Sequence, residues 1–155
     1  MSPQQLAFRV KTASAEDVRD HLRSCDRFFK PRLSTRVDLA QYSEKIARHA
    51  TTFEAWYGGE LIGLAAAYFS DDDERSAFLT SVSVEERFTR RDVARTLIRM
   101  CVESAHSAGV RSVSLEVSRD ALAAIELYRS HGFVEVQDDG STVMMRLDSD
   151  VPQKQ

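Results

Sequence analysis

The feature that most restricts the possible folds is a long helical pattern set between two strand patterns in the second half of the chain. Apolar residues recur every three to four positions across residues 93–105, and Gly109 then ends the pattern as a helix C-cap would. The flanking segments, residues 76–84 and 110–117, are instead typical of strands. A strand, a helix and a strand in this order predict one right-handed parallel crossover.

Shorter patterns around the crossover predict the remaining elements. A strand at residues 6–12 precedes two helices at about 14–24 and 37–49, and residues 51–57 and 60–69 flank Gly58-Gly59 as a hairpin. A helix at about 120–131 and a closing hairpin, 133–136 with 142–147, follow the crossover. The predicted order is β-α-α-β-β-β-α-β-α-β-β, an α+β fold (α/β under a looser definition) with a mixed, mostly antiparallel sheet. We expect a single domain over residues 1–148 and a disordered tail at 149–155.

Composition excludes several classes of function. The 155 residues include 21 Lys and Arg against 24 Asp and Glu, a net charge of −3, so we expect no nucleic-acid partner bound through its phosphates. No apolar run approaches the roughly 18 residues of a membrane span, and the first residues lack the pattern of a secretory signal. Cys25, Cys101 and the four histidines show no disulfide, redox or metal-binding spacing. The sequence therefore predicts a cytoplasmic protein without a metal site.

The best candidate for chemistry is the junction between the first crossover strand and its helix. The chain has no nucleophile elbow, no P-loop and no dinucleotide-binding glycine pattern. A helix that begins directly after a strand presents free amide groups and a positive dipole end, which suit a phosphate. Residues 82–95 (VSVEERFTRRDVAR) also place arginines around this helix start.

Three phrases resemble the GCN5-related N-acetyltransferase (GNAT) superfamily, over about residues 53–147. Residues 60–63 (ELIG), after the Gly-Gly turn, are similar to the family's hairpin, and residues 82–98 to its acetyl-coenzyme-A (acetyl-CoA) motif. Residues 115–117 (LEV) followed by 124–133 (AIELYRSHGF) resemble its ending, LEV…AIxLYxxxGF. The resemblance implies acetyl-CoA as co-substrate, with its pantetheine arm entering a gap between two splayed parallel strands.

The resemblance also implies roles for single residues. Backbone groups of Val82 and Val84 would pair with the pantetheine and polarise the thioester carbonyl, and Tyr128 would protonate the departing thiolate. Glu116 is the candidate general base, because related ribosomal-protein alanine acetyltransferases carry Glu and Tyr at the same twelve-residue separation. A core tyrosine, and a structural ion pair for a Glu116 carboxylate on a central strand, are the competing interpretations. The cofactor's pyrophosphate would lie on the helix start, at Thr89, Arg90, Arg91, Asp92, Val93, Ala94 and Arg95.

The pyrophosphate loop departs from the family pattern Q/R-x-x-G-x-G/A. Thr89 replaces the long polar residue, Asp92 replaces the glycine and only Ala94 matches, while Ala121 stands where the family usually has Asn. As a natural N-cap, the Asp92 carboxylate is predicted to accept hydrogen bonds from the amides of Ala94 and Arg95. It would then fill the phosphate site, unless the neighbouring arginines bind the phosphates instead.

Two functions follow from these patterns. The first is an N-acetyltransferase that moves an acetyl group directly from acetyl-CoA to a primary amine. The alternative is a non-catalytic acetyltransferase-like module that has lost CoA binding. The expected acceptor is a small-molecule or peptide amine, and the aromatic and basic segment 28–32 (FFKPR) would suit one with an anionic part. The closing hairpin, with Met144 and Met145, would allow a homodimer.

Overall fold

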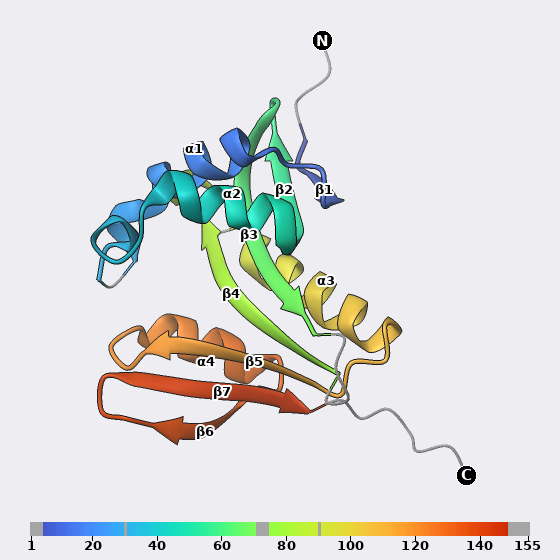
Figure 1. Cartoon of the computed structure of the whole chain (residues 1–155), viewed down its shortest axis with the longest axis vertical. Coiled ribbons are helices and arrows are strands. Elements are labelled where there is room, and N and C mark those ends of the chain that lie inside the picture. The colour runs from blue at the N-terminus through green and yellow to red at the C-terminus, as the bar shows by residue number, and fades with distance from the viewer. Residues whose placement is uncertain (1–4, 30, 71–74, 90, 149–155) are drawn as a thin grey trace.

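The computed structural model describes residues 5–29, 31–70, 75–89 and 91–148, arranged as Figure 1 shows. Among these residues, seven strands form one sheet in the order β1-β2-β3-β4-β5-β7-β6, with β4 and β5 parallel and the other neighbours antiparallel. The strands are β1 (Ala7–Val10), β2 (Thr51–Tyr57), β3 (Glu60–Phe69), β4 (Ser76–Val84), β5 (Ser112–Ser118), β6 (Val134–Asp138) and β7 (Thr142–Asp148). The helices are α1 (Ala15–Cys25), α2 (Leu39–His49), α3 (Val93–Ser107) and α4 (Leu122–Ser130). The predicted element order and mixed sheet are confirmed, and the predicted tail at 149–155 lies outside the described residues.

Short-range signals set where the first helix and the first hairpin turn begin. α1 starts in a capping box, in which Asp17 N donates to Ser14 Oγ at 3.0 Å and Ser14 N donates to Asp17 Oδ2 at 2.9 Å. Gly58 and Gly59 have φ values of 59° and 81°, which permit the tight turn between β2 and β3. The local sequence therefore fixes these two positions before any tertiary packing.

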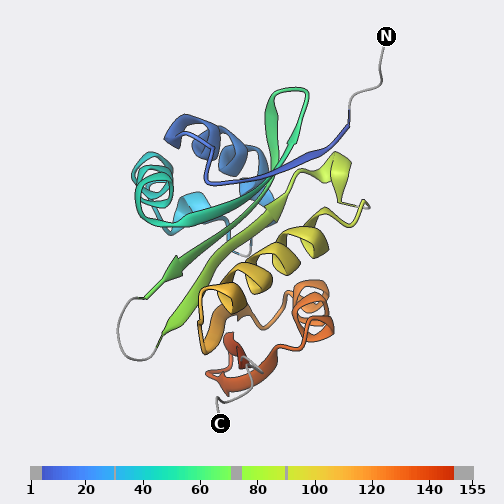
Figure 2. The ribbon, with the colours of Figure 1, turned by 90° about the vertical axis from the view of Figure 1, so that its right-hand side faces the viewer.

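Two apolar cores lie on opposite faces of the sheet. α1 and α2 cover one face, and α3 and α4 cover the other (Figure 2). Gly63 allows α3 to lie close against β3, because a Cβ at this position would be only 2.8 Å from Val93 Cγ1 and 3.2 Å from Leu97 Cδ1. Met145 is fully buried within the chain's own core, so it is unavailable for the dimer contact that the sequence suggested.

The parallel strands β4 and β5 pair at one end only. Residues 76–79 pair with residues 112–115, and from there the two strands diverge, as Figure 1 shows. The divergence begins at Thr80, which is an extra residue in β4: Ala66 lies opposite Ser81 and Ala67 lies opposite Leu79, so Thr80 has no partner on β3. A bulge of this kind bends a strand, and here it turns the end of β4 away from β5.

A buried carboxylate holds the N-terminal segment onto the sheet. Glu54 on β2 is fully buried, and its Oε2 accepts hydrogen bonds from Thr12 N at 2.8 Å, Ala13 N at 3.0 Å and Thr52 Oγ1. Its Oε1 accepts from Trp56 Nε1 at 3.0 Å and from Thr12 Oγ1. Burial alone would raise the pKa of Glu54, but these hydrogen bonds outweigh burial and hold the pKa below its ordinary value.

Candidate functional site

β4 turns the backbone groups of Val82 and Val84 into the gap beside β5. Glu85 N donates to Ile62 O at 2.8 Å, which makes these two residues a hydrogen-bonded pair of the antiparallel β3–β4 ladder. Bonded and non-bonded pairs alternate along such a ladder, so Val84 and Val82 belong to non-bonded pairs. Their N–H and C=O groups therefore point away from β3, toward the part of β5 with which β4 does not pair.

The predicted cap at the start of α3 is wrong. Asp92 has a left-handed backbone (φ 57°, ψ 24°), and its side chain makes no capping hydrogen bond. The side chain is 84% exposed, and Oδ1 lies 3.9 Å from Arg95 Nε. The physical reason is the backbone, since a capping side chain needs an extended residue. The same conformation suits glycine best and aspartate better than most residues, which accounts for Asp92 at the glycine position of the family pattern.

The first amides of α3 have no acceptor within the helix. Thr96 N is bonded to Asp92 O at 3.0 Å, as the first turn of a helix requires. Within the described residues, the amides of Val93, Ala94 and Arg95 have no acceptor. Together with the positive end of the helix dipole, these amides can bind a phosphate.

A groove of about 450 Å³, the α3–α4 groove, brings four of the predicted cofactor-binding residues together. It is lined from the α3 side and from α4 by Thr89, Asp92, Ala94, Arg95, Ala123, Glu126, Leu127 and Ser130. Arg91 does not line this groove, and its guanidinium lies 5.8 Å from the ring centroid of Phe88. The side chain of Val93 is buried in the core, and Arg90 lies outside the described residues. The structure thus gathers part of the predicted loop around one groove.

A second groove, the β5–α4 groove, brings Val82, Glu116 and Tyr128 together. It has a volume of about 520 Å³ and adjoins the α3–α4 groove at Ala123, which lines both. Its far wall is the connection between α1 and α2, including Phe28 and Phe29 of the predicted acceptor segment. This connection contains two 3₁₀ turns, Asp26–Phe28 and Leu33–Thr35.

Tyr128 has the properties of a proton donor at this groove. Its side chain is 9% exposed and packs edge-on against Phe133, with 5.9 Å between ring centroids. Burial raises the pKa of Tyr128 to about 12, so the hydroxyl keeps its proton at neutral pH. No described residue forms a hydrogen bond with this hydroxyl, which leaves it free to donate to a ligand.

Glu116 on β5 lines the same groove. It is exposed rather than buried, because β5 has lost β4 as a neighbour at this point. Among the described residues Glu116 has no ion-pair partner, so the structural ion pair considered from the sequence is not found. The carboxylate is therefore open to a ligand in the β5–α4 groove.

A buried histidine on α1, which no sequence motif marks, holds β4 from the other face of the sheet. His21 Nδ1 lies 3.1 Å from Leu61 O, and Nε2 lies 2.9 Å from Ser83 Oγ. A carbonyl only accepts, so Nδ1 carries the proton and Ser83 Oγ donates to Nε2. Burial lowers the pKa of His21 to about 4, which keeps the ring neutral. Because Ser83 lies between Val82 and Val84, His21 fixes the segment that faces the gap.

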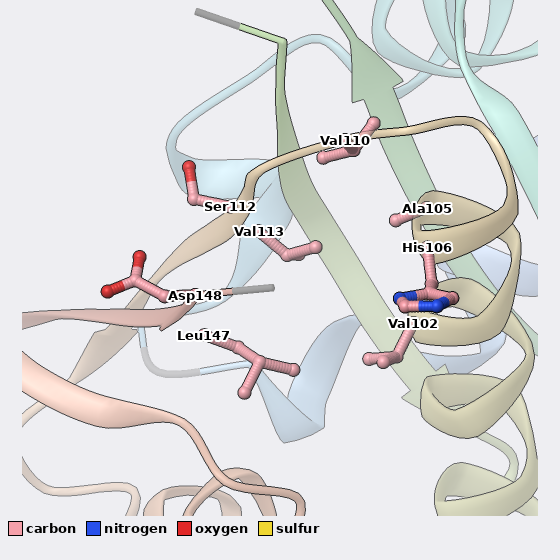
Figure 3. Close-up of a pocket in the computed structure, with 8 residues that line it drawn as sticks. All are labelled: Val102, Ala105, His106, Val110, Ser112, Val113, Leu147 and Asp148. Atoms are coloured by element: carbon pink, nitrogen blue, oxygen red, sulfur yellow. The ribbon is translucent and has the colours of Figure 1, made fainter. Parts of the chain in front are cut away.

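A third hollow, of about 280 Å³, lies away from these residues at the other end of the crossover (Figure 3). Val102, Val113 and Leu147 line it from α3, β5 and β7, and no predicted site residue reaches it. Within the described residues, no group of three or more His, Cys, Asp and Glu could hold a metal ion. No described helix is both long and apolar enough to cross a membrane.

Comparisons with solved structures find the same fold. The chain is similar to the ribosomal-protein-S18-alanine N-acetyltransferase from Escherichia coli, with a TM-score of 0.77, 18% identity and 97% of each chain covered. It is similar to the ribosomal-protein-alanine N-acetyltransferase from Brucella melitensis, with a TM-score of 0.71 and 23% identity over 92% of this chain and 99% of that one. It is also similar to the PaiA N-acetyltransferase from Thermoplasma acidophilum in complex with coenzyme A, with a TM-score of 0.70 and 16% identity over 92% of this chain and 99% of that one. No curated protein matches the sequence.

A family model identifies the chain at the level of sequence. The model, described as the acetyltransferase (GNAT) family, matches residues 15–133, which is more than two thirds of the chain. The match runs from the capping box of α1 to the end of α4, and so includes both grooves' predicted site residues. The chain belongs to the GNAT acetyltransferase family, a family of N-acetyltransferases that use acetyl-CoA as acetyl donor.

Proposed function

We propose that this protein transfers an acetyl group directly from acetyl-CoA to a primary amine while both substrates are bound. The observation that carries the proposal is the β5–α4 groove, where a protonated Tyr128 and an unpaired Glu116 face the segment of β4 with free backbone groups. An acid, a base and a set of fixed donors are the three groups that acetyl transfer to an amine requires.

The residues present fit an extended thioester of a nucleotide. The free amides at the start of α3 would bind its pyrophosphate, with Arg95 beside them, and the N–H and C=O groups of Val82 and Val84 would pair with the amides of its pantetheine arm. Acetyl-CoA, when bound, supplies an acetyl group that is activated as a thioester. The two adjoining grooves would hold the nucleotide end and the reacting end.

The chemistry balances with the residues named. The acceptor nitrogen forms a bond to the acetyl carbon, and the carbon–sulfur bond breaks with its electron pair left on sulfur. An N–H of β4 stabilises the negative charge that develops on the carbonyl oxygen. Glu116 takes the proton that the amine loses, and Tyr128 gives its proton to sulfur. Exchange with solvent then returns Glu116 and Tyr128 to their starting states.

The alternative, a module that has lost CoA binding, rested on the departures from the family pattern at residues 89–94 and at Ala121, of which Asp92 is the main one. Its carboxylate was expected to occupy the first amides of α3, but it is exposed and makes no capping hydrogen bond. The Asp92 carboxylate therefore does not block the phosphate site, which favours the N-acetyltransferase over this alternative.

Release of CoA thiol from acetyl-CoA in the presence of amines tests the proposed function. Tyr128→Phe keeps the ring and its contact with Phe133 but removes the proton, so we expect kcat to fall by roughly 10- to 10³-fold with little change in the melting temperature. Tyr68→Phe is the matched control, because Tyr68 packs against the core on the α1 side of the sheet and should leave kcat unchanged. An unchanged kcat in folded Tyr128→Phe would assign Tyr128 to packing alone.

A further inference from the structure

Arg36 is a cationic residue that lines the β5–α4 groove and that the proposed chemistry does not use. Its backbone N donates to Leu33 O at 2.9 Å at the end of a 3₁₀ turn, and Leu33 is 3% exposed. The side chain is exposed and forms no ion pair with a described residue, whereas Arg27 in the same connection pairs with Glu86 at 3.1 Å. The fold therefore holds the start of a long cationic side chain in place, and the guanidinium has no ion-pair partner among the described residues.

The opposite wall of the groove is negatively charged. Glu116 on β5 and Asp120 in the turn before α4 line the same groove as Arg36, and all three also line an adjoining hollow of about 520 Å³. Among the described residues, Arg36 pairs with neither carboxylate. The groove thus keeps opposite charges apart on its two walls, an arrangement that is complementary to a ligand with both an ammonium and an anionic group.

Two exposed apolar side chains line the same groove. Phe28 is 48% exposed and Leu122 is 70% exposed, and both line the β5–α4 groove. Large apolar side chains that converge on one concave site from two separate elements are typical of a ligand pocket. An acceptor with an apolar body would cover both of them.

We propose that the acceptor is an α-amino acid with a large apolar side chain, whose carboxylate is bound by Arg36. This inference rests on the proposed function and names the substrate class of the same site. The amine lies toward Glu116 and Tyr128, the carboxylate pairs with the Arg36 guanidinium, and the side chain packs on Phe28 and Leu122. Arg36 is then a specificity-determining residue.

The charges favour a carboxylate over other anions. One guanidinium matches one carboxylate in geometry and in charge. A doubly charged phosphate would leave excess negative charge facing Glu116 and Asp120. A peptide N-terminus offers an amine but no carboxylate beside it, so it would leave Arg36 without a partner.

L-phenylalanine and L-phenylalaninamide provide a matched pair of acceptors, because they differ only in the carboxylate. We would measure kcat/KM for both by CoA release and by mass spectrometry of the N-acetyl product, in wild type, Arg36→Ala and Arg23→Ala. Arg23 is an exposed arginine near the end of α1 that lines neither groove, so it is the matched control. The ratio of kcat/KM for the two substrates is compared between variants, so that the difference in basicity of the two amines cancels.

We expect Arg36→Ala to lower kcat/KM for L-phenylalanine by about 10- to 100-fold and for L-phenylalaninamide by less than about 3-fold. Arg23→Ala should change neither value. Equal losses for both acceptors, or a wild-type enzyme that acetylates the amide but not the amino acid, would overturn the inference and leave the proposed function intact. A failure to release CoA with any amine, in protein that acetyl-CoA stabilises against heat, would overturn both.

Discussion

Replacing Glu54 with glutamine should cost the protein about 2–4 kcal/mol of unfolding free energy. The carboxylate accepts five hydrogen bonds, and an amide can accept at only one of its two positions. The amide oxygen is best placed at the Oε2 position, because two backbone N–H groups converge there. The NH₂ group then faces Thr12 Oγ1, which can rotate and accept, and Trp56 Nε1, which can only donate.

The magnitude follows from the group left without a partner. A buried donor that loses its acceptor costs roughly 1–3 kcal/mol, and the remaining bonds weaken because the acceptor is no longer charged. Removing the charge brings no compensating relief, since the lowered pKa of Glu54 means that this site favours the ionised form over the neutral one. The loss should therefore exceed that of an average surface substitution.

A double-mutant cycle with Trp56→Phe isolates the orphaned donor. Phenylalanine keeps most of the ring and removes the N–H, so the pair Glu54→Gln/Trp56→Phe should recover about 1 kcal/mol or more relative to additivity. Urea unfolding followed by far-UV circular dichroism suits all four proteins, because Trp56 is the only tryptophan and fluorescence would be lost with it.

The pH dependence supplies a second check. A carboxylate with a lowered folded pKa contributes stability that is present above its unfolded pKa of about 4.3 and is lost as the pH falls through the folded value. The difference in unfolding free energy between wild type and Glu54→Gln should therefore become smaller below about pH 4. A loss under 1 kcal/mol at pH 7, or purely additive effects of the two substitutions, would refute this account of the network.

Three further predictions concern the site. Asp92→Gly should tighten CoA binding by only about 2- to 5-fold in calorimetric titration, because solvent screens the exposed carboxylate. If binding is no tighter even at low salt, the Asp92 carboxylate lies away from the phosphates. Glu116→Gln should lower kcat/KM by about 10- to 100-fold at pH 7 and by less at pH 9, where more of the amine is already neutral. A loss of kcat/KM that is the same at both pH values would contradict a role of Glu116 as the base. Burial lowers the pKa of His21 from 6.5 to about 4, so its contribution to stability is complete above pH 6.5 and is lost as the pH falls toward 4. Over this pH range, the free energy of unfolding measured in urea should therefore fall by about 3 kcal/mol more for wild type than for His21→Gln. Parallel pH profiles of the two proteins would contradict this role of His21.

The parts of the fold that the sequence predicts are those set by local chemistry. The hairpin around Gly58-Gly59, the helix start at Ser14 and the apolar stripe of α3 follow from turn preference, capping and periodicity, and all three are confirmed. The features that it does not predict depend on distant partners. The sequence predicts a cap at Asp92 because it does not show the φ that the preceding turn imposes, and nothing in it indicates that five donors from two segments surround Glu54.

The candidate site divides in the same way. The phrase around Tyr128 marks that residue because the helix and its neighbours are contiguous in sequence. Arg36 carries no such mark, because its role depends on a groove whose other wall is formed by residues about 80 positions later in the chain. One arginine among many cannot be singled out until the fold shows which charges share a cavity.

The extra residue at Thr80 determines which kinds of genetic change β4 can absorb. The apolar residues that contact the core on the α3 side lie at odd positions before Thr80 and at even positions after it: Ala77, Leu79, Val82 and Val84. Ser81 and Ser83 are thereby directed to the α1 side, where Ser83 meets His21. Point substitutions disturb this arrangement one side chain at a time. Loss of the codon for Thr80 would instead place Ser81 directly after Leu79, so that both faces keep their residues but the bulge that turns the end of β4 away from β5 is lost.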